Sequence, residues 1–292
     1  MSVVPATIPP VTFDAPLPGD LASLFVDGAA AGRSLAVALP PGRVVVPEGG
    51  GRPAFWLSDG PVPAGLWARL RAEHGRSGLW PLLLDSQDDD DAAYPPWGNG
   101  EVVVGELQPG ERDAEAFLAR SWDDYTGHSD DDPLTPAERL AVTSPYGRQW
   151  PGRAPAPVST TDPDRTADGL AEQLLAGHQS MRLGLVAAER GADSLTVAGW
   201  TGPTNYIPDT ADLSAVLRDW EDRFGARVVG VGFDTLLLSV TAPPATHAEA
   251  LAVAVEHFAL CPDNVWQFDG AHPLFTYAER LVGDHSWTFW WD

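Results

Sequence analysis

The segment from residue 212 to residue 240 constrains the fold more than any other part of this 292-residue sequence. Five apolar residues recur there at the i, i+3, i+4, i+7, i+11 spacing of one helix face: Leu213, Val216, Leu217, Trp220 and Phe224. Gly225 is a typical residue just after a helix end, and the stretch ARVVGVGFDTLLLSV (226–240) then predicts two strands that meet near Phe233 and Asp234. An amphipathic helix that leads into two strands must bury its apolar face, which predicts a compact unit of helix and sheet.

The elements around this segment suggest a topology. Strands are predicted at 181–188, 194–200 and 285–291, and a helix at 272–281. Thr246 and Glu249 form a capping box that opens a further helix, which must stop before Pro262. From residue 194 onward the order β-α-β-β-α-(α)-β is that of a ferredoxin-like split β-α-β plan. Strand 181–188 is expected to form a hairpin with 194–200, which already has two neighbours in this plan, so its pairing stays open.

The first half of the chain predicts a smaller α/β domain. Its expected strands are 34–40, 43–48, 53–59, 78–86 and 101–107, and its expected helices are 62–74 and 111–125. Residues 129–165 contain seven Pro and show no apolar periodicity, which is typical of a linker. The predicted fold is therefore α+β: an N-terminal α/β domain with an acidic segment (1–128), a Pro-rich linker (129–165) and a C-terminal α+β domain with its own core (166–292).

Composition narrows the class of protein. The single Cys excludes an internal disulfide framework, and no segment reaches the roughly 18 apolar residues of a membrane span. The N-terminus lacks the basic and apolar regions of a signal peptide, so a soluble cytoplasmic protein with no membrane partner is expected. All 18 basic residues are Arg, which excludes Schiff-base lysine chemistry and a P-loop. A net charge of −23 disfavours binding to nucleic acid.

Much of the acid is concentrated in one block. Residues 85–132 hold 15 Asp or Glu against two Arg, including the runs Asp88–Asp91 and Asp130–Asp132. A solvated acidic loop is the simplest interpretation, and a docking patch for a basic protein is the alternative.

Four motifs point to a known family. TNY (204–206), WEDRFGARVVGVGFDTL (220–236), CPDNVWQ (261–267) and WWD (290–292) resemble, in this order, a bacterial family known as domain of unknown function 4253. The resemblance covers about residues 181–292, and GLWPLLLD (78–85) resembles the leading region of longer actinobacterial members. This family implies no activity, so function must be argued from the site.

Cys261 is the only Cys in the chain, and His257 lies one helical turn before it. The pair could act as a nucleophile and base, or bind a metal ion together with Asp263, His272 or His285. Both residues, however, fall in the last turn of the predicted helix, whose negative end raises a thiol pKa. A structural role is therefore preferred, and no catalytic residue, metal or cofactor is predicted.

The predicted topology gathers polar residues at one end of the C-terminal sheet. They are Asn205, Tyr206, Asp234, His257, Cys261, Asp263, Asn264 and His285. We expect Asn205, Asp234 and Asp263 to share one cleft, with His285 leaving the group if the last strand lies elsewhere. Gly230 and Gly232 alternate along a strand, which permits close approach of a packed element or a ligand.

These features favour a non-catalytic protein that binds a small ligand or peptide. One alternative is an acidic immunity or inhibitor protein that masks a basic partner. The other is a hydrolase or transferase that uses His257, Cys261 and Asp263.

Overall fold

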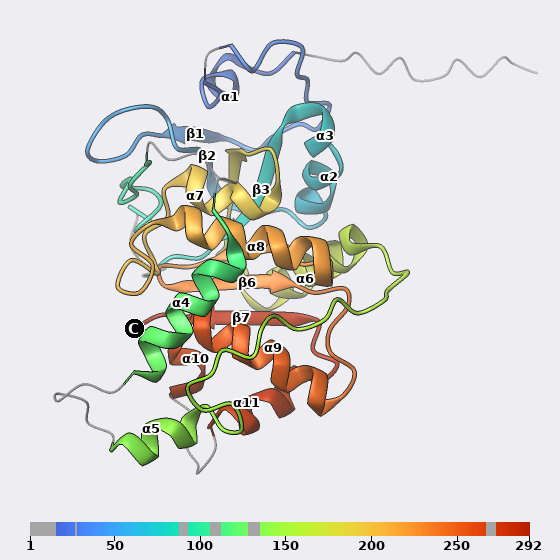
Figure 1. The fold of residues 1–292 in the computed structure, drawn as a ribbon. Coiled ribbons are helices and arrows are strands. Elements are labelled where there is room, and N and C mark those ends of the chain that lie inside the picture. Colours follow the sequence, from blue (N-terminus) through green and yellow to red (C-terminus); the bar gives the residue numbers. More distant parts are fainter. Residues whose placement is uncertain (1–15, 27, 88–92, 106–111, 128–134, 267–272) are drawn as a thin grey trace, which may run out of the picture.

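The computed structural model describes residues 16–26, 28–87, 93–105, 112–127, 135–266 and 273–292. Their seven strands form one mixed sheet in the order β1-β2-β4-β3-β5-β6-β7 (Figure 1). The strands are β1 (Gly42–Val45), β2 (Phe55–Pro61), β3 (Leu79–Leu84), β4 (Arg182–Ala187), β5 (Arg227–Val231), β6 (Thr235–Ser239) and β7 (Ser286–Trp290). Adjacent β3 and β5 run parallel, and the other neighbouring strands pair antiparallel.

Helices cover both faces of this sheet (Figure 1). One face packs against α4 (Ala114–Thr126), α7 (Ser194–Ala198), α8 (Thr210–Phe224), α9 (His247–Leu260), α10 (Asp263–Trp266) and α11 (Pro273–Leu281). The other packs against α1 (Gly19–Ala22), α2 (Leu66–Ala72) and α6 (Pro163–Gly177). The remaining helices are α3 (His74–Ser77), α5 (Pro136–Val142) and the 3-10 helix η1 (Gly191–Asp193). Because successive strand residues point to opposite faces, Leu82 and Leu84 pack in the core on the α8 and α9 side of the sheet. Leu83 packs in the core on the α2 and α6 side.

The helices predicted from local signals are confirmed. The carboxylate of Asp209 caps the amide of Ala211 at the start of α8, and Gly225 ends the helix with a φ of 61°. The capping box of Thr246 and Glu249 opens α9, which ends at Leu260, just before Cys261 and Pro262. These features depend on residues close in sequence, so they can be recognised without knowledge of the tertiary structure.

The mixed α+β class is confirmed, but the ferredoxin-like split β-α-β arrangement is not found in this sheet. Residues 194–198 form α7 and not a strand, with Leu195 and Ala198 buried and Gly199 closing the helix at a φ of 74°. β4 pairs with β2 and β3, and β5, β6 and β7 follow one another as a meander. Every residue from 194 to 200 except Val197 is buried, and so short a run does not distinguish a strand from a buried helix, which explains the error.

Two of the strands predicted in the N-terminal half, 34–40 and 101–107, are not formed by the described residues. Residues 34–40 contain a single isolated bridge, between Ser34 and Pro16. Residues 101–105 form no strand, and residues 106 and 107 lie outside the described ranges.

The sheet extends across the predicted domain boundary. β3, from the first half of the chain, lies between β4 and β5 of the second half. The segment predicted as a linker contains α5 and the first residues of α6, and the amide of Ala154 within it donates to the buried carboxylate of Glu256, 2.6 Å away. Ala154 is thus held against the core, whereas most of residues 155–162 are exposed.

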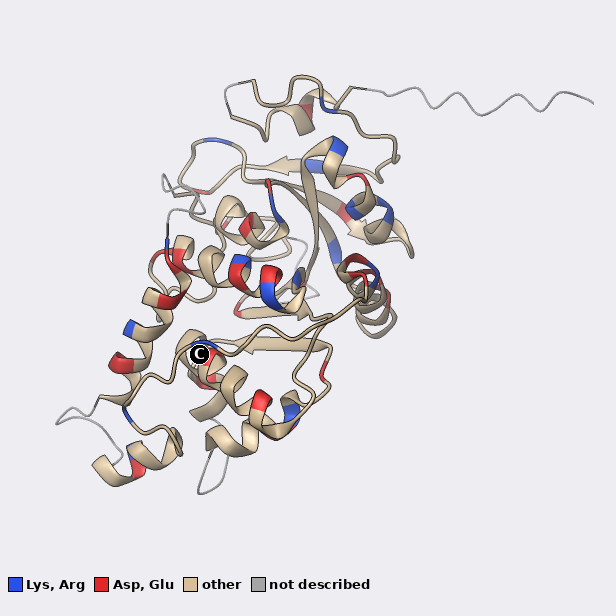
Figure 2. Cartoon of the chain, turned by 45° about the vertical axis from the view of Figure 1, so that its right-hand side comes forward, with Lys and Arg blue, Asp and Glu red and all other residues tan. Residues whose placement is uncertain are grey.

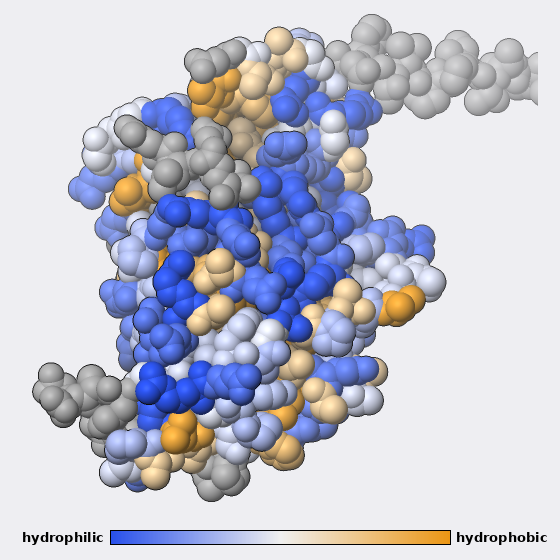
Figure 3. All heavy atoms as spheres, in the orientation of Figure 1, coloured by the Kyte–Doolittle hydropathy of each residue, from blue (hydrophilic) through white to orange (hydrophobic). Residues whose placement is uncertain are grey.

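The face of the molecule shown in Figure 3 is predominantly hydrophilic. On the described part of the face seen in Figure 3, apolar residues are scattered among polar ones. Figure 2 shows Arg and acidic residues close together along α8, where Arg223 pairs with Asp219. None of the helices within the described ranges is long and apolar enough to cross a bilayer.

Candidate functional site

A cleft lies where the parallel strands β3 and β5 end. Leu84 is paired with Val231, so the carboxyl ends of the two strands lie side by side, at the same end of the sheet. In open α/β sheets, ligand crevices form outside the carboxyl ends of such strands. The cleft has a volume of about 320 Å³, within the range of small-ligand sites. Its lining residues are Asp85, Ser86, Gln87, Gly232, Phe233, Asp234, Thr235 and Leu237.

Three tryptophan side chains fix the two loops that form this cleft. The indole N–H of Trp97 donates to the carbonyl of Asp85 at 2.6 Å. The indole of Trp200 lies 3.0 Å from the carbonyl of Gly232 and 3.1 Å from that of the next residue. The indole of Trp290 donates to the carboxylate of Asp234 at 3.0 Å. Because Trp97 and Trp200 are almost fully buried, the walls of the cleft are held before any ligand arrives.

Polar and aromatic groups face the cleft side by side. The second oxygen of the Asp234 carboxylate accepts the hydroxyl of Thr235 at 3.0 Å, so this side chain is oriented by two donors. The neighbouring residue, Phe233, is 42% exposed and also lines the cleft. A Cβ added at Gly232 would lie 3.5 Å from the nearest side-chain atom, so this residue leaves the cleft open without close contacts.

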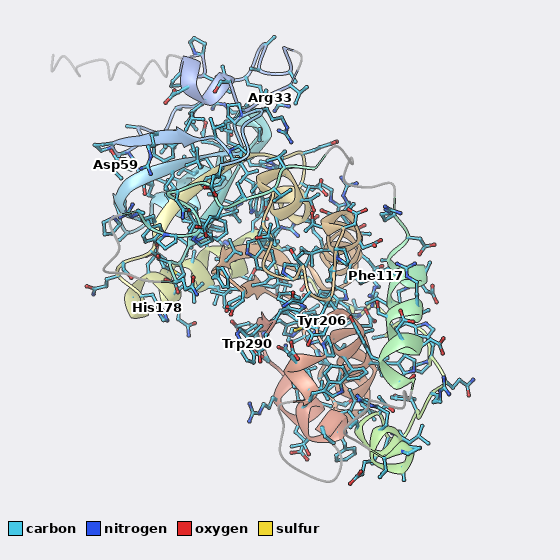
Figure 4. The ribbon with its side chains drawn as sticks, turned by 90° about the vertical axis from the view of Figure 1, so that its left-hand side faces the viewer. Arg33, Asp59, Phe117, His178, Tyr206 and Trp290 are labelled. Carbon is cyan, nitrogen blue, oxygen red and sulfur yellow. The ribbon has the colours of Figure 1, made fainter. Side chains whose placement is uncertain are left out.

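Of the eight predicted site residues, only Asp234 lines this cleft. Asn205, Tyr206 and Asp263 instead surround the backbone of Asp292, just past the end of β7. Asp263 accepts the Tyr206 hydroxyl at 3.0 Å and the amide of Asp292 at 3.0 Å, and Asn205 donates to the Asp292 carbonyl at 3.3 Å. Burial and the hydrogen bond to Asp263 raise the pKa of Tyr206 to about 12. Tyr206 and Trp290 are labelled in Figure 4.

The side chain of Asn264 forms hydrogen bonds with the backbone of β7 along the edge opposite β6. Its side-chain amide donates to the carbonyl of Thr288 at 2.8 Å and accepts the amide of Trp290 at 3.2 Å. Its other N–H donates to the Tyr277 hydroxyl at 3.1 Å. The Cys261 thiol completes this clamp with a hydrogen bond of 2.9 Å to the Trp290 carbonyl. The CPDN and WWD motifs therefore meet in space, and their contacts hold the edge strand in place.

We expect Asn264→Ala to lower the free energy of unfolding by about 2 kcal/mol, because it removes hydrogen bonds to the Trp290 amide, the Thr288 carbonyl and the Tyr277 hydroxyl. Urea denaturation would measure this loss, and hydrogen exchange of the Trp290 amide should accelerate. Asn205→Ala is the matched control, since Asn205 is exposed and makes one long hydrogen bond. Equal losses in the two variants would contradict the clamp.

His257 and Cys261 are buried structural groups. Nδ1 of His257 lies 2.9 Å from the Tyr277 hydroxyl, and its ring packs against Trp287 and Phe289. Burial lowers the pKa of His257 to about 3 and raises that of Cys261 to about 12. At neutral pH the imidazole is therefore uncharged and the thiol protonated, which is the opposite of an activated pair.

A family model matches the C-terminal part of the chain. Residues 182–292 match the family model described as Domain of unknown function (DUF4253). The C-terminal part of the chain is a DUF4253 domain. The match confirms the resemblance carried by the four motifs. The chain matches no curated protein and no solved structure.

The cleft is shared between the DUF4253 domain and the sequence before it. Gly232, Phe233, Asp234, Thr235 and Leu237 come from the domain, whereas residues 85–87 come from the end of β3. Sequence reasoning missed residues 85–87. The sequence does place these three residues directly after the wholly buried strand LWPLLL. They line a cleft, however, only because β3 pairs with β5, and the sequence did not reveal this pairing.

The remaining candidates lie away from the cleft. His285 stands at the start of β7, the opposite end from Trp290, and its Nδ1 lies 2.7 Å from the Val240 carbonyl. Within the described ranges no group of three His, Cys, Asp or Glu residues could hold a metal ion. His272 and the acidic runs Asp88–Asp91 and Asp130–Asp132 lie outside those ranges, so an acidic docking patch stays a prediction.

Proposed function

We propose that this protein is a non-catalytic binding protein and that the cleft at the carboxyl ends of β3 and β5 receives a small ligand. The observation that carries the proposal is the set of three indole hydrogen bonds, from Trp97, Trp200 and Trp290, which fix the loops around a hollow lined by polar groups. A cleft of this kind loses little conformational entropy on binding, because its walls are already ordered. The cytoplasmic location expected from the composition is part of this proposal.

The protonation states argue for binding over catalysis. The enzyme alternative would use His257, Cys261 and Asp263, but His257 and Cys261 are fully buried and their pKa values are shifted away from general-base and nucleophile roles. Asp263 is 5% exposed, and its carboxylate accepts the Tyr206 hydroxyl and the Asp292 amide. None of the three lines the cleft.

A fragment library screened by ligand-observed NMR would test the proposal. Gly232→Leu should fill the cleft: the Cβ meets only ordinary contacts, at 3.5 Å from Thr235 and 3.9 Å from Asp85. We expect fragments to bind the wild-type protein and to lose binding in Gly232→Leu. Gly169→Leu is the control, because Gly169 is exposed on α6 with open space around it. Circular dichroism would verify the fold of both variants. If no fragment binds, or if Gly232→Leu leaves every hit unchanged, the proposal is wrong.

A further inference from the structure

The charge of the cleft indicates which ligands it can accept. Its lining contains the carboxylates of Asp85 and Asp234, and no Arg or His among the described residues lines it. Asp234 forms no ion pair within the described part of the chain. A hollow lined by charges of one sign focuses the electrostatic field and raises the local concentration of ions of the opposite sign.

A second cleft, of about 330 Å³, provides a comparison within the same molecule. It lies at the other ends of β3 and β5, and both signs of charge line it. There Arg71 and Arg227 lie 2.8 Å and 3.1 Å from the Asp164 carboxylate, and Arg190 lies 2.6 Å from that of Glu221. These arginines pair with Asp164 and Glu221, two of the three acids that line the second cleft, whereas Asp234 in the first cleft forms no ion pair within the described ranges.

The surroundings of Asp234 suit a positively charged group that carries an apolar part. The carboxylate is held by Trp290 and Thr235, and both of its oxygens keep lone pairs for a further donor. Phe233 lines the same cleft and is partly exposed, and cations are attracted to the faces of aromatic rings. An anion would instead meet the Asp234 carboxylate in a lining that contains no Arg or His among the described residues.

We propose, as a step that rests on the proposed function, that the cleft binds small organic cations. The ligand class is an ammonium or amidinium group, held by the carboxylates of Asp234 and Asp85, on an apolar body that contacts Phe233. Charge-assisted hydrogen bonds are roughly twice as strong as neutral ones, so the positive charge contributes most of the specificity. The volume of about 320 Å³ limits the ligand to a compact molecule.

Three probes of one shape test this class: benzylammonium, benzyl alcohol and benzoate. Titrations followed by protein-observed NMR at pH 7 should show benzylammonium binding at least about tenfold more tightly than benzyl alcohol, and benzoate not binding. Rising salt should weaken the binding of benzylammonium. Asp234→Asn and Asp85→Asn should each reduce it about tenfold or more, whereas Asp123→Asn, on the exposed surface of α4, should not.

The outcomes separate the two proposals. If benzyl alcohol or benzoate binds the cleft as tightly as benzylammonium, the cationic class is wrong, and the binding function survives because Gly232→Leu still removes the signal. If both carboxylate variants bind benzylammonium like the wild type, the cationic class is also wrong. If the library and all three probes fail to bind, the binding function itself is wrong.

Discussion

A fragment of residues 166–292, which contains all the residues that match the DUF4253 model, is expected to remain unfolded when it is produced alone. β4 and β5 do not pair with each other, because β3 lies between them. β3 pairs with β4 over six residues, from Leu79 with Ala187 to Leu84 with Arg182, and all six of its residues are buried. Removal of residues 1–165 would leave β4 and β5 with unpaired backbone groups and exposed apolar faces at the centre of the sheet.

Far-UV circular dichroism and the dispersion of amide signals in NMR spectra would measure this outcome, with the full chain as the reference. Addition of a fragment of residues 16–165 should restore the native spectrum, since it supplies β3 together with β1 and β2. Cooperative unfolding of residues 166–292 without this partner would instead support the independent C-terminal domain predicted from the sequence.

The fold predictions that were right depend on residues close in sequence, and those that were wrong depend on residues far apart in sequence. The start of α9 depends on Thr246 and Glu249, three residues apart, and the end of α8 depends on Gly225 alone. The position of β3 depends on contacts with β4 and β5, about 100 residues or more away in sequence. Such pairing is decided by competition among all strands, which no local pattern records.

The candidate site shows the same division. The sequence predicted Asp234 at a hairpin tip, and the structure has this residue between β5 and β6, in the lining of a cleft. The indole of Trp290, 56 residues away, orients its carboxylate, and no spacing in the sequence pairs the two. Asn264 and Cys261 were selected as polar groups with distinctive chemistry, but they stabilise β7. The distinctive chemistry of a motif can thus reflect a hydrogen-bonded joint and not a ligand site.

Among single substitutions, loss of the buried carboxylate of Glu256 is expected to lower the free energy of unfolding most. Glu256 is 0% exposed on α9 and accepts the amide of Ala154 at 2.6 Å, the indole of Trp220 at 2.7 Å and the guanidinium of Arg223 at 2.5 Å. Asp219 is the second carboxylate that pairs with this guanidinium. One side chain thus joins α8, α9 and the Pro-rich segment. Removal of one partner from a buried ion pair costs about 3–5 kcal/mol, because the remaining charge is left without compensation.

We therefore expect Glu256→Ala to lower the free energy of unfolding by about 3–5 kcal/mol, measured by urea denaturation. Glu256→Gln should lose less, because its amide oxygen can still accept one of the three donors. Glu279→Ala, on the exposed face of α11, is the control and should stay within about 0.5 kcal/mol of the wild type. Limited proteolysis should also cut residues 151–162 faster in Glu256→Ala, since the Ala154 amide loses its acceptor. If Glu256→Ala and Glu279→Ala were equally stable, the Pro-rich segment would be held to the core by its other contacts, and the buried charge would contribute little to the fold.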